Sequence, residues 1–142
     1  MIVPDINLLM YAYTSDAPHH EAARSWWEGC LSGTVMVGIP WVVALGFVRL
    51  MSSRAVLTDP LTPVEALEHV ASWLERPQAL VLIPGPRHLE ILSSIMAAAG
   101  VTGRLTTDAH LAALAMENQA ELCSNDADFA RFPGLRWHNP LG

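Results

Sequence analysis

The sequence contains no lysine and only two cysteines, and its apolar stretches are short. Cys30 and Cys123 both lie in apolar surroundings, and two thiols do not make the disulfide framework of a small secreted domain. A membrane span needs roughly 18 uninterrupted apolar residues. The longest candidate, residues 35–50, is interrupted by a proline, a glycine and an arginine. The N-terminus has no basic segment ahead of an apolar one, so we expect a cytoplasmic protein without signal peptide or membrane contact.

Charged residues are also scarce, at 15% of the chain, and 14 acidic residues against eight arginines give a net charge of −6. With 51% hydrophobic residues the chain is not disordered. An acidic protein does not attract nucleic acid at long range, which counts against a nucleic-acid enzyme. Two effects offset this: cations neutralise clustered acids locally, and arginine makes bidentate contacts with phosphate. The length predicts one domain, residues 1–142.

Short apolar runs, the first two of them rich in β-branched residues, alternate with helical patterns along the whole chain. The first run, Ile2 and Val3, is typical of a strand buried on both faces of a sheet. The alternation predicts an α/β fold, a three-layer α/β/α sandwich with a central parallel sheet of four to five strands. If the first and fourth strands are neighbours, the topological switch point, where such sheets bind ligands, lies between them. The expected strands are 2–3, 34–38, 80–83, 122–123 and 135–138, and the expected helices are 6–13, 19–31, 40–52, 63–75, 87–99 and 107–118.

Aspartates stand where expected strands end or a helix begins. Asp5 follows the first strand, Asp108 opens the last helix, and Asp126 and Asp128 follow the fourth strand. Clustered carboxylates repel one another unless a cation holds them, and hard oxygen ligands suit Mg²⁺ or Mn²⁺. Such a site favours hydrolysis of a phosphodiester. We expect Asp5, Asp108 and Asp126 to be catalytic, with Asp5 and Asp108 as primary ligands, Asp126 holding a ligand water or a second ion, and Asp128 as a further candidate ligand.

Each acid also has an ordinary structural explanation. Asp5 alone is equally well explained as the N-cap of the helix that follows it. Asp108 alone is a first-turn acid that the helix dipole favours, and Asn125 with Asp126 alone is a turn. The functional interpretation therefore depends on these acids meeting at one place.

Three further residues are candidates for contacts with substrate. Arg49 is the first, because its expected helix reaches the acidic pocket; a solvated arginine is the common alternative. Asn7 either holds Asp5, meets a phosphate, or bonds to local backbone. Asn125, next to the last acids, is the third candidate.

The acid-bearing segments resemble those of PIN-domain proteins, and more narrowly the VapC ribonuclease toxins of bacterial toxin–antitoxin pairs. The segment MIVPDINLLMYA resembles the family's first strand with its first acid. GRLTTDAHLAALA resembles the segment with the third acid, and LCSNDADFARFPGLRW the closing segment. The resemblance implies an endoribonuclease dependent on Mg²⁺, with Mn²⁺ as a substitute, that cleaves RNA. It also implies a homodimer and a VapB-type antitoxin that inhibits it in a hetero-oligomer.

One position departs from the family's pattern. The second acid, usually a glutamate three residues before an arginine, is replaced by Gly46 in PWVVALGFVRL. The glycine allows either close helix packing or room for substrate, but it supplies no carboxylate. We therefore predict a single-ion site centred on Asp5 and Asp108. The alternatives are a catalytically degenerate PIN domain that binds RNA or protein, and a phosphatase of small phosphoesters.

Overall fold

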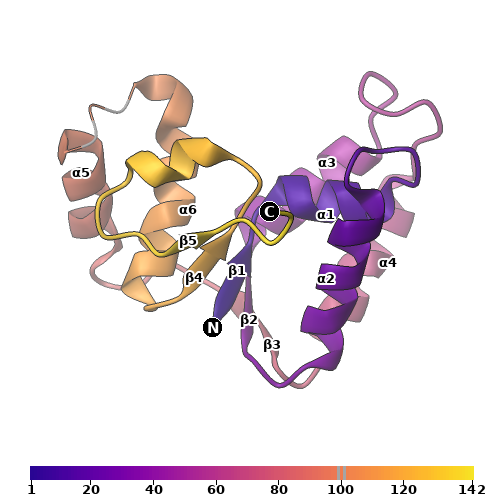
Figure 1. The fold of residues 1–142 in the computed structure, drawn as a ribbon, viewed down its shortest axis with the longest axis horizontal. Coiled ribbons are helices and arrows are strands. Elements are labelled where there is room, and N and C mark those ends of the chain that lie inside the picture. Colours follow the sequence, from indigo (N-terminus) through magenta and orange to yellow (C-terminus); the bar gives the residue numbers. More distant parts are fainter. Residues whose placement is uncertain (99, 101) are drawn as a thin grey trace.

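A computed structural model of the chain describes residues 1–98, 100 and 102–142 and shows a five-stranded sheet between helices (Figure 1). The strands are β1 (Ile2–Pro4), β2 (Val37–Pro40), β3 (Ala79–Leu82), β4 (Glu121–Cys123) and β5 (Trp137–His138). Their order is β3-β2-β1-β4-β5, and every neighbouring pair is parallel. The predicted parallel α/β fold is confirmed, and β1 and β4 are neighbours, as the switch-point argument requires.

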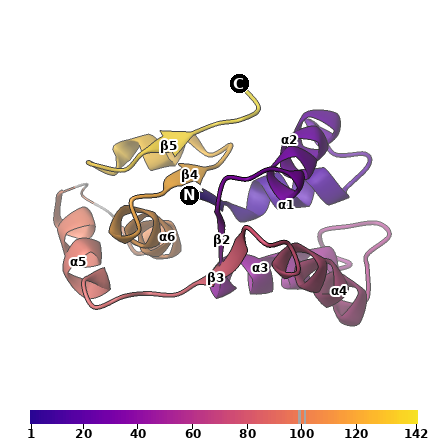
Figure 2. The ribbon, with the colours of Figure 1, turned by 90° about the horizontal axis from the view of Figure 1, so that it is seen from below.

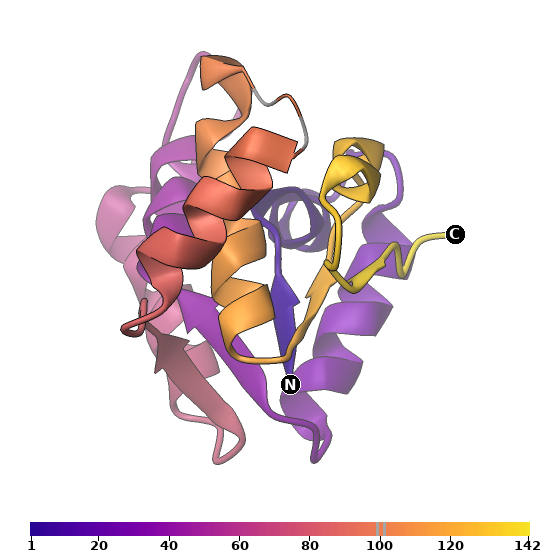
Figure 3. The same cartoon turned by 90° about the vertical axis from the view of Figure 1, so that its left-hand side faces the viewer.

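Helices cover both faces of this sheet (Figures 2 and 3). One face carries α1, α2, α3 and α4, and the other carries the α5–α6 pair. None of the helices in the described part of the chain is long and apolar enough to span a membrane. The helices are α1 (Ile6–Tyr13), α2 (His20–Ser32), α3 (Trp41–Met51), α4 (Pro63–Leu74), α5 (His88–Ala98) and α6 (Thr106–Glu117), with the short 3₁₀ helices η1 (Gly103–Leu105) and η2 (Ala127–Arg131).

The second strand begins later than its sequence suggests. Residues 34–38 are rich in β-branched side chains, but Val35 and Met36 are 58% and 44% exposed. The ladder starts at Val37, which pairs with both Ile2 of β1 and Ala79 of β3. The neighbouring strands, rather than the local composition, therefore set this boundary. The helix expected over 87–99 is α5, and its last expected residue lies outside the described residues.

Aromatic side chains join the helices of the α1–α4 layer to one another. Trp73 of α4 meets Trp27 of α2 edge-on at 5.4 Å between ring centroids, and it meets Phe47 of α3 at 4.8 Å. The Trp73 indole N–H donates to the Tyr13 hydroxyl over 2.8 Å. Buried aromatic pairs of this kind contribute about 0.5–1.5 kcal/mol each beyond their burial.

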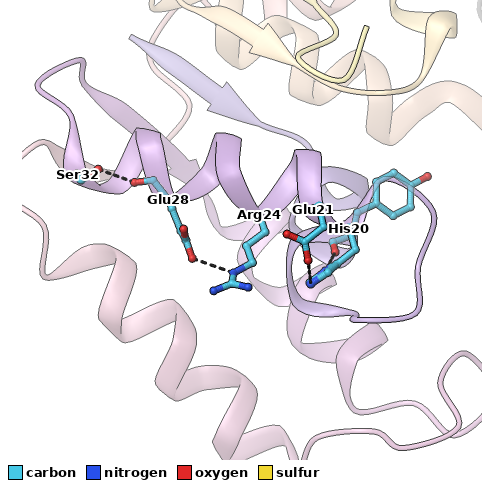
Figure 4. A network of polar contacts seen from close by, with 6 residues as sticks. His20, Glu21, Arg24, Glu28 and Ser32 are labelled. Atoms are coloured by element: carbon cyan, nitrogen blue, oxygen red, sulfur yellow. Dashed lines mark hydrogen bonds and ion pairs between the residues drawn. The ribbon is translucent and has the colours of Figure 1, made fainter.

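The outer face of α2 is polar and explains its amphipathic pattern (Figure 4). Arg24 donates to Glu28 over 3.0 Å, one turn along the helix, while Ala23 and Trp27 face the core. Both charged side chains are more than half exposed. An exposed pair at this spacing stabilises a helix by only about 0.3–0.5 kcal/mol. The core face of α2 therefore outweighs its charged face in holding the helix in place.

The start of α5 is held by a side chain from the end of α6. The Glu117 carboxylate accepts hydrogen bonds from the backbone N–H groups of Gly85 and Arg87, at 2.8 and 2.9 Å. We expect E117A to lower the free energy of unfolding by about 1–3 kcal/mol, because two donors at a helix start lose a charged acceptor. Urea denaturation measures this. The control is E90A, which removes an exposed acid of α5 and should cost less than about 0.5 kcal/mol. Equal losses in the two variants would contradict the prediction.

Candidate active site

The carboxyl ends of β1 and β4 bring the first and last acids together. The Asp5 backbone N–H donates to the carbonyl of Cys123 over 2.9 Å, so Asp5 lies directly beside Ser124. Ser124 has no exposed surface, and its hydroxyl donates to Asp5 Oδ2 over 2.7 Å. The register of two parallel strands thus joins residues more than a hundred positions apart.

The Ser124 hydroxyl is saturated with hydrogen bonds. Its oxygen accepts from the backbone N–H of Asp126 at 3.0 Å and from Asn7 Nδ2 at 3.3 Å. Because a hydroxyl oxygen accepts about two bonds and donates one, the Ser124 proton is directed at Asp5. The backbone N–H of Asn125 donates to Asn7 Oδ1 over 3.4 Å, which fixes the orientation of the Asn7 amide. The network therefore presents a donor to Asp5 and requires Asp5 to accept.

Asp5 is both a helix cap and a member of the acid cluster. Its Oδ1 accepts from the backbone N–H of Ile6 over 2.8 Å, so Asp5 is the N-cap of α1, as the sequence also suggests. Burial raises the pKa of Asp5, and the negative charge of Asp126 raises it further. The hydrogen bonds from Ser124 and Ile6 lower it again. These bonds stabilise the carboxylate in a place where burial favours its protonation.

Asp108 lies in the first turn of α6 and is partly buried. Its pKa is raised to about 6, first by burial and then by the charges of Asp5, Asp126 and Asp128. Arg104, on η1, lowers this pKa. Since a charge acts on a pKa only at short range, Asp5, Asp126 and Asp128 lie in the neighbourhood of Asp108, and we call these four residues the aspartate cluster.

The donor chemistry of this cluster fits a hard divalent cation. Among the side chains that the structure describes, no three or more His, Cys, Asp or Glu residues form a set that could hold a metal ion. Mg²⁺ is commonly bound through one or two carboxylates, with water completing its octahedral shell. The aspartates therefore suit an ion that takes few ligands directly from the protein. The pKa values of Asp5 and Asp108 are both raised, and a bound cation would relieve the repulsion between the carboxylates.

Gly46 serves the packing of α1 against α3. It is buried, and a Cβ atom at this position would overlap Cδ1 of Ile6. Ile6, which directly follows Asp5, therefore packs against α3 at the position where the family's second acid would stand. Of the two explanations for this glycine, close helix packing is the one that the structure shows.

The candidate substrate contacts differ in their surroundings. The side chains of Asn7 and Asn125 belong to the hydrogen-bond network around Ser124, and Asn125 Oδ1 also accepts from Asn139 Nδ2 over 3.1 Å. Arg49 is exposed in the last turn of α3.

The remaining residues of the site are an arginine, the last two acids and a serine. Arg104 is the cation that acts on Asp108. Asp126 caps η2 by accepting from the Asp128 backbone N–H at 2.9 Å. The Asp128 Oδ1 atom lies 3.8 Å from the Arg131 Nε atom, as an ion pair. Sequence reasoning missed Ser124, although a serine between an apolar strand and Asn125-Asp126 could have indicated it.

Comparisons with known proteins identify the family of this chain. The family model described as the PIN domain matches residues 2–135. Ribonuclease VapC33 of Mycobacterium tuberculosis is 42% identical over 141 residues, which cover 99% of each chain. Ribonuclease VapC37 of the same organism is 41% identical over 140 residues, covering 99% of this chain and 97% of that one.

Solved structures share the fold at low sequence identity. The chain resembles one in the crystal structure of VapBC2 from Rickettsia felis bound to a promoter DNA fragment, with a TM-score of 0.69, 16% identity and 98% coverage of both chains. It also resembles the toxin VapC20 of Mycobacterium tuberculosis, with a TM-score of 0.68, 16% identity and coverage of 96% and 99%. The family model and the two full-length relatives show that this chain belongs to the PIN domain family and, within it, to the VapC ribonucleases.

Proposed function

We propose that this chain is a Mg²⁺-dependent endoribonuclease that hydrolyses phosphodiester bonds in single-stranded or looped RNA and acts in the cytoplasm as a toxin. The observation that carries the proposal is the aspartate cluster at the β1 and β4 ends, in a chain 42% identical to a protein named as a ribonuclease. Loops are the accessible substrate because bases in duplex RNA are hidden in a deep, narrow groove.

Each residue of the cluster has a proposed task. Asp5 and Asp108 would hold Mg²⁺ or Mn²⁺, which when bound polarises a phosphoryl oxygen and makes water more acidic. Asp126 has one oxygen tied to η2 and can use the other to orient the attacking water. Asp128, whose charge also acts on Asp108, would be a further candidate ligand. Arg104 would attract a phosphate beside Asp108, and Arg49 would contact RNA further along α3.

The chelator and an isosteric variant test the function together. Purified wild-type protein should cleave a single-stranded RNA in Mg²⁺, and EDTA should abolish the cleavage. D5N removes the charge of Asp5 and keeps its shape, so we expect loss of cleavage and of growth arrest in cells. Cleavage that survives both treatments would remove Asp5 and the metal from the mechanism. Wild-type protein that binds RNA without cleaving it would instead support the degenerate binding module, and cleavage of small phosphoesters alone would support the phosphatase.

We expect one metal ion per chain. Gly46 supplies no carboxylate, and Ile6 occupies the space where a side chain at position 46 would lie. The carboxylates left to bind a cation are therefore those around Asp5 and Asp108. Calorimetric titration with Mn²⁺ should give a stoichiometry near one, and D108N should remove most of the heat. Two tight and equivalent sites would contradict this prediction.

The proposed partners are a VapB-type antitoxin, which would inhibit the enzyme in a hetero-oligomer, and a second copy of this chain. The structure from Rickettsia felis is titled as a VapBC complex bound to promoter DNA, which supports a toxin–antitoxin pair. Trp41 and Leu45 lie one turn apart on α3 and are 49% and 55% exposed. Exposed apolar side chains of this size are typical of surfaces that a partner covers.

A further inference from the structure

A chain of amide groups leads from the C-terminal segment to the aspartate cluster. The backbone N–H of Leu141 donates to Asn139 Oδ1 over 3.0 Å. Asn139 Nδ2 then donates to Asn125 Oδ1 over 3.1 Å. Asn125 stands between Ser124 and Asp126, so the C-terminal segment reaches the site at this residue.

The orientation of both side-chain amides is fixed by the backbone N–H at the start of the chain. A backbone N–H can only donate, so the Asn139 atom that faces Leu141 is the oxygen. The amino group of Asn139 must then face Asn125, and because it too can only donate, the atom that meets it is the Asn125 oxygen. The amino group of Asn125 is therefore turned away from Asn139.

The Asn125 amino group is an available donor. Within the described part of the chain it makes no hydrogen bond, and it is not among the buried polar atoms that lack a partner, which are in Trp27 and His88. It is thus open to solvent, on a partly buried residue that neighbours the acids. Asn125 presents two N–H donors and no net charge at the position next to Asp126.

The C-terminal segment is anchored firmly enough to impose this orientation. The Trp137 indole N–H donates to the Ser124 carbonyl, and the Ser124 backbone N–H donates to the His138 carbonyl, both over 3.0 Å. These bonds flank Asn139 on its N-terminal side, and the bond from Leu141 holds it from the other side. Asn139 is therefore held in register with the end of β4.

We propose that the relay Leu141–Asn139–Asn125 turns the side-chain N–H donors of Asn125 toward a phosphate oxygen of the RNA. Asn125 is the substrate contact and Asn139 is a positioning residue that acts through it. The proposal rests on the function proposed above, since it needs an RNA phosphate at the cluster. An anionic substrate entering an acidic site gains from a fixed donor, whereas a flipped Asn125 would present its oxygen and repel the phosphate.

The variant N139D tests the relay because it inverts the direction of the second bond. The new carboxylate still accepts from Leu141, but it has no proton for Asn125. Asn125 then has to turn its amino group inward and its oxygen outward. We expect RNA affinity to fall about 10-fold, the size of one lost hydrogen bond to a charged group. Binding is measured by fluorescence anisotropy with a labelled single-stranded RNA oligonucleotide in Mg²⁺, in a D108N background that prevents cleavage.

Two controls separate orientation from charge. Q119E adds the same charge on an exposed side chain just past the end of α6, about 15 Å along the helix from Asp108, and should change affinity less than about 2-fold. In an N125A background, N139D should have little further effect, because the residue that it orients is absent. In the cleaving enzyme, N139D should raise KM and leave kcat unchanged, whereas general damage to the site would lower kcat.

The outcomes are distinct. Equal effects of N139D and Q119E, or an N139D effect that persists without Asn125, would overturn the relay. If N139D fails to fold, N139A removes the orienting donor without adding charge and should raise KM about 3-fold; an unchanged KM would overturn the relay as well. A D108N parent that binds no RNA, with a wild type that cleaves none, would overturn the proposed function and the relay together.

Discussion

The D108N variant should be more stable than the wild type in the absence of metal and should lose RNA cleavage. Asp108 lies in the first turn of α6, and the charges of Asp5, Asp126 and Asp128 act on it together with its burial. An asparagine of the same shape removes one of four clustered negative charges. After allowance for screening by water at a partly exposed group, we expect a gain of about 1 kcal/mol, or roughly 2–4 °C in Tm.

The pH dependence of this gain follows from the raised pKa. The folded protein holds the Asp108 proton up to a pKa of about 6, against an ordinary value of 3.8. Below pH 3.8 Asp108 is protonated in both the folded and the unfolded state, so it does not lower the free energy of unfolding. Between 3.8 and 6 the unfolded state loses the proton first, so folding stability falls as the pH rises, and above 6 the cost is constant. The Tm difference between D108N and wild type should therefore be smallest near pH 4 and largest near pH 7.

Metal and activity complete the test of Asp108. Mg²⁺ should raise the Tm of the wild type and leave that of D108N nearly unchanged, because only the folded wild type binds the ion well. Cleavage should fall by about 10²–10³-fold or more, since the variant loses a proposed metal ligand. D59N, in an exposed loop, removes one negative charge elsewhere and should leave Tm and cleavage unchanged. A D108N protein that cleaves RNA normally would falsify the proposed role of Asp108.

The sequence predicts the order of the elements because most strands lie in short apolar runs and the helices between them carry periodic apolar faces. It also predicts where Asp5, Asp108 and Asp126 stand, since chain order alone places them at strand ends or a helix start. The start of β2 is not predictable in this way. Val35 and Met36 have the composition of a strand, but no neighbouring strand pairs with them, so the ladder excludes them.

The side-chain network of the site is beyond a single sequence. The bonds from Ser124 to Asp5 and from Asn7 to Ser124 join residues separated by 119 and 117 positions, and only the β1–β4 register brings them together. The contact of Ile6 with Gly46 likewise depends on how α1 lies against α3. Sequence therefore finds the acids, whereas the residues that hold and orient them emerge only in three dimensions.

Ser124 should be as important to the site as an acid, although it is uncharged. S124A leaves Asp5 Oδ2 without its donor, and it leaves the Asp126 backbone N–H and Asn7 Nδ2 without their acceptor. Because Ser124 has no exposed surface, water cannot easily replace these bonds. We expect a loss of about 2–3 kcal/mol in the free energy of unfolding, and a 10–100-fold weaker affinity for Mg²⁺.

The pH dependence of metal binding separates the hydrogen bond of Ser124 from its packing. The bond to Ser124 lowers the pKa of Asp5, so its removal raises that pKa and moves the midpoint for Mg²⁺ binding to higher pH. S124T keeps the hydroxyl and adds a methyl group to a buried place, which costs stability but should leave the midpoint of the wild type. If S124A binds Mg²⁺ with the wild-type affinity and midpoint, Ser124 only fills space, and Asp5 keeps its charge through the Ile6 N–H alone.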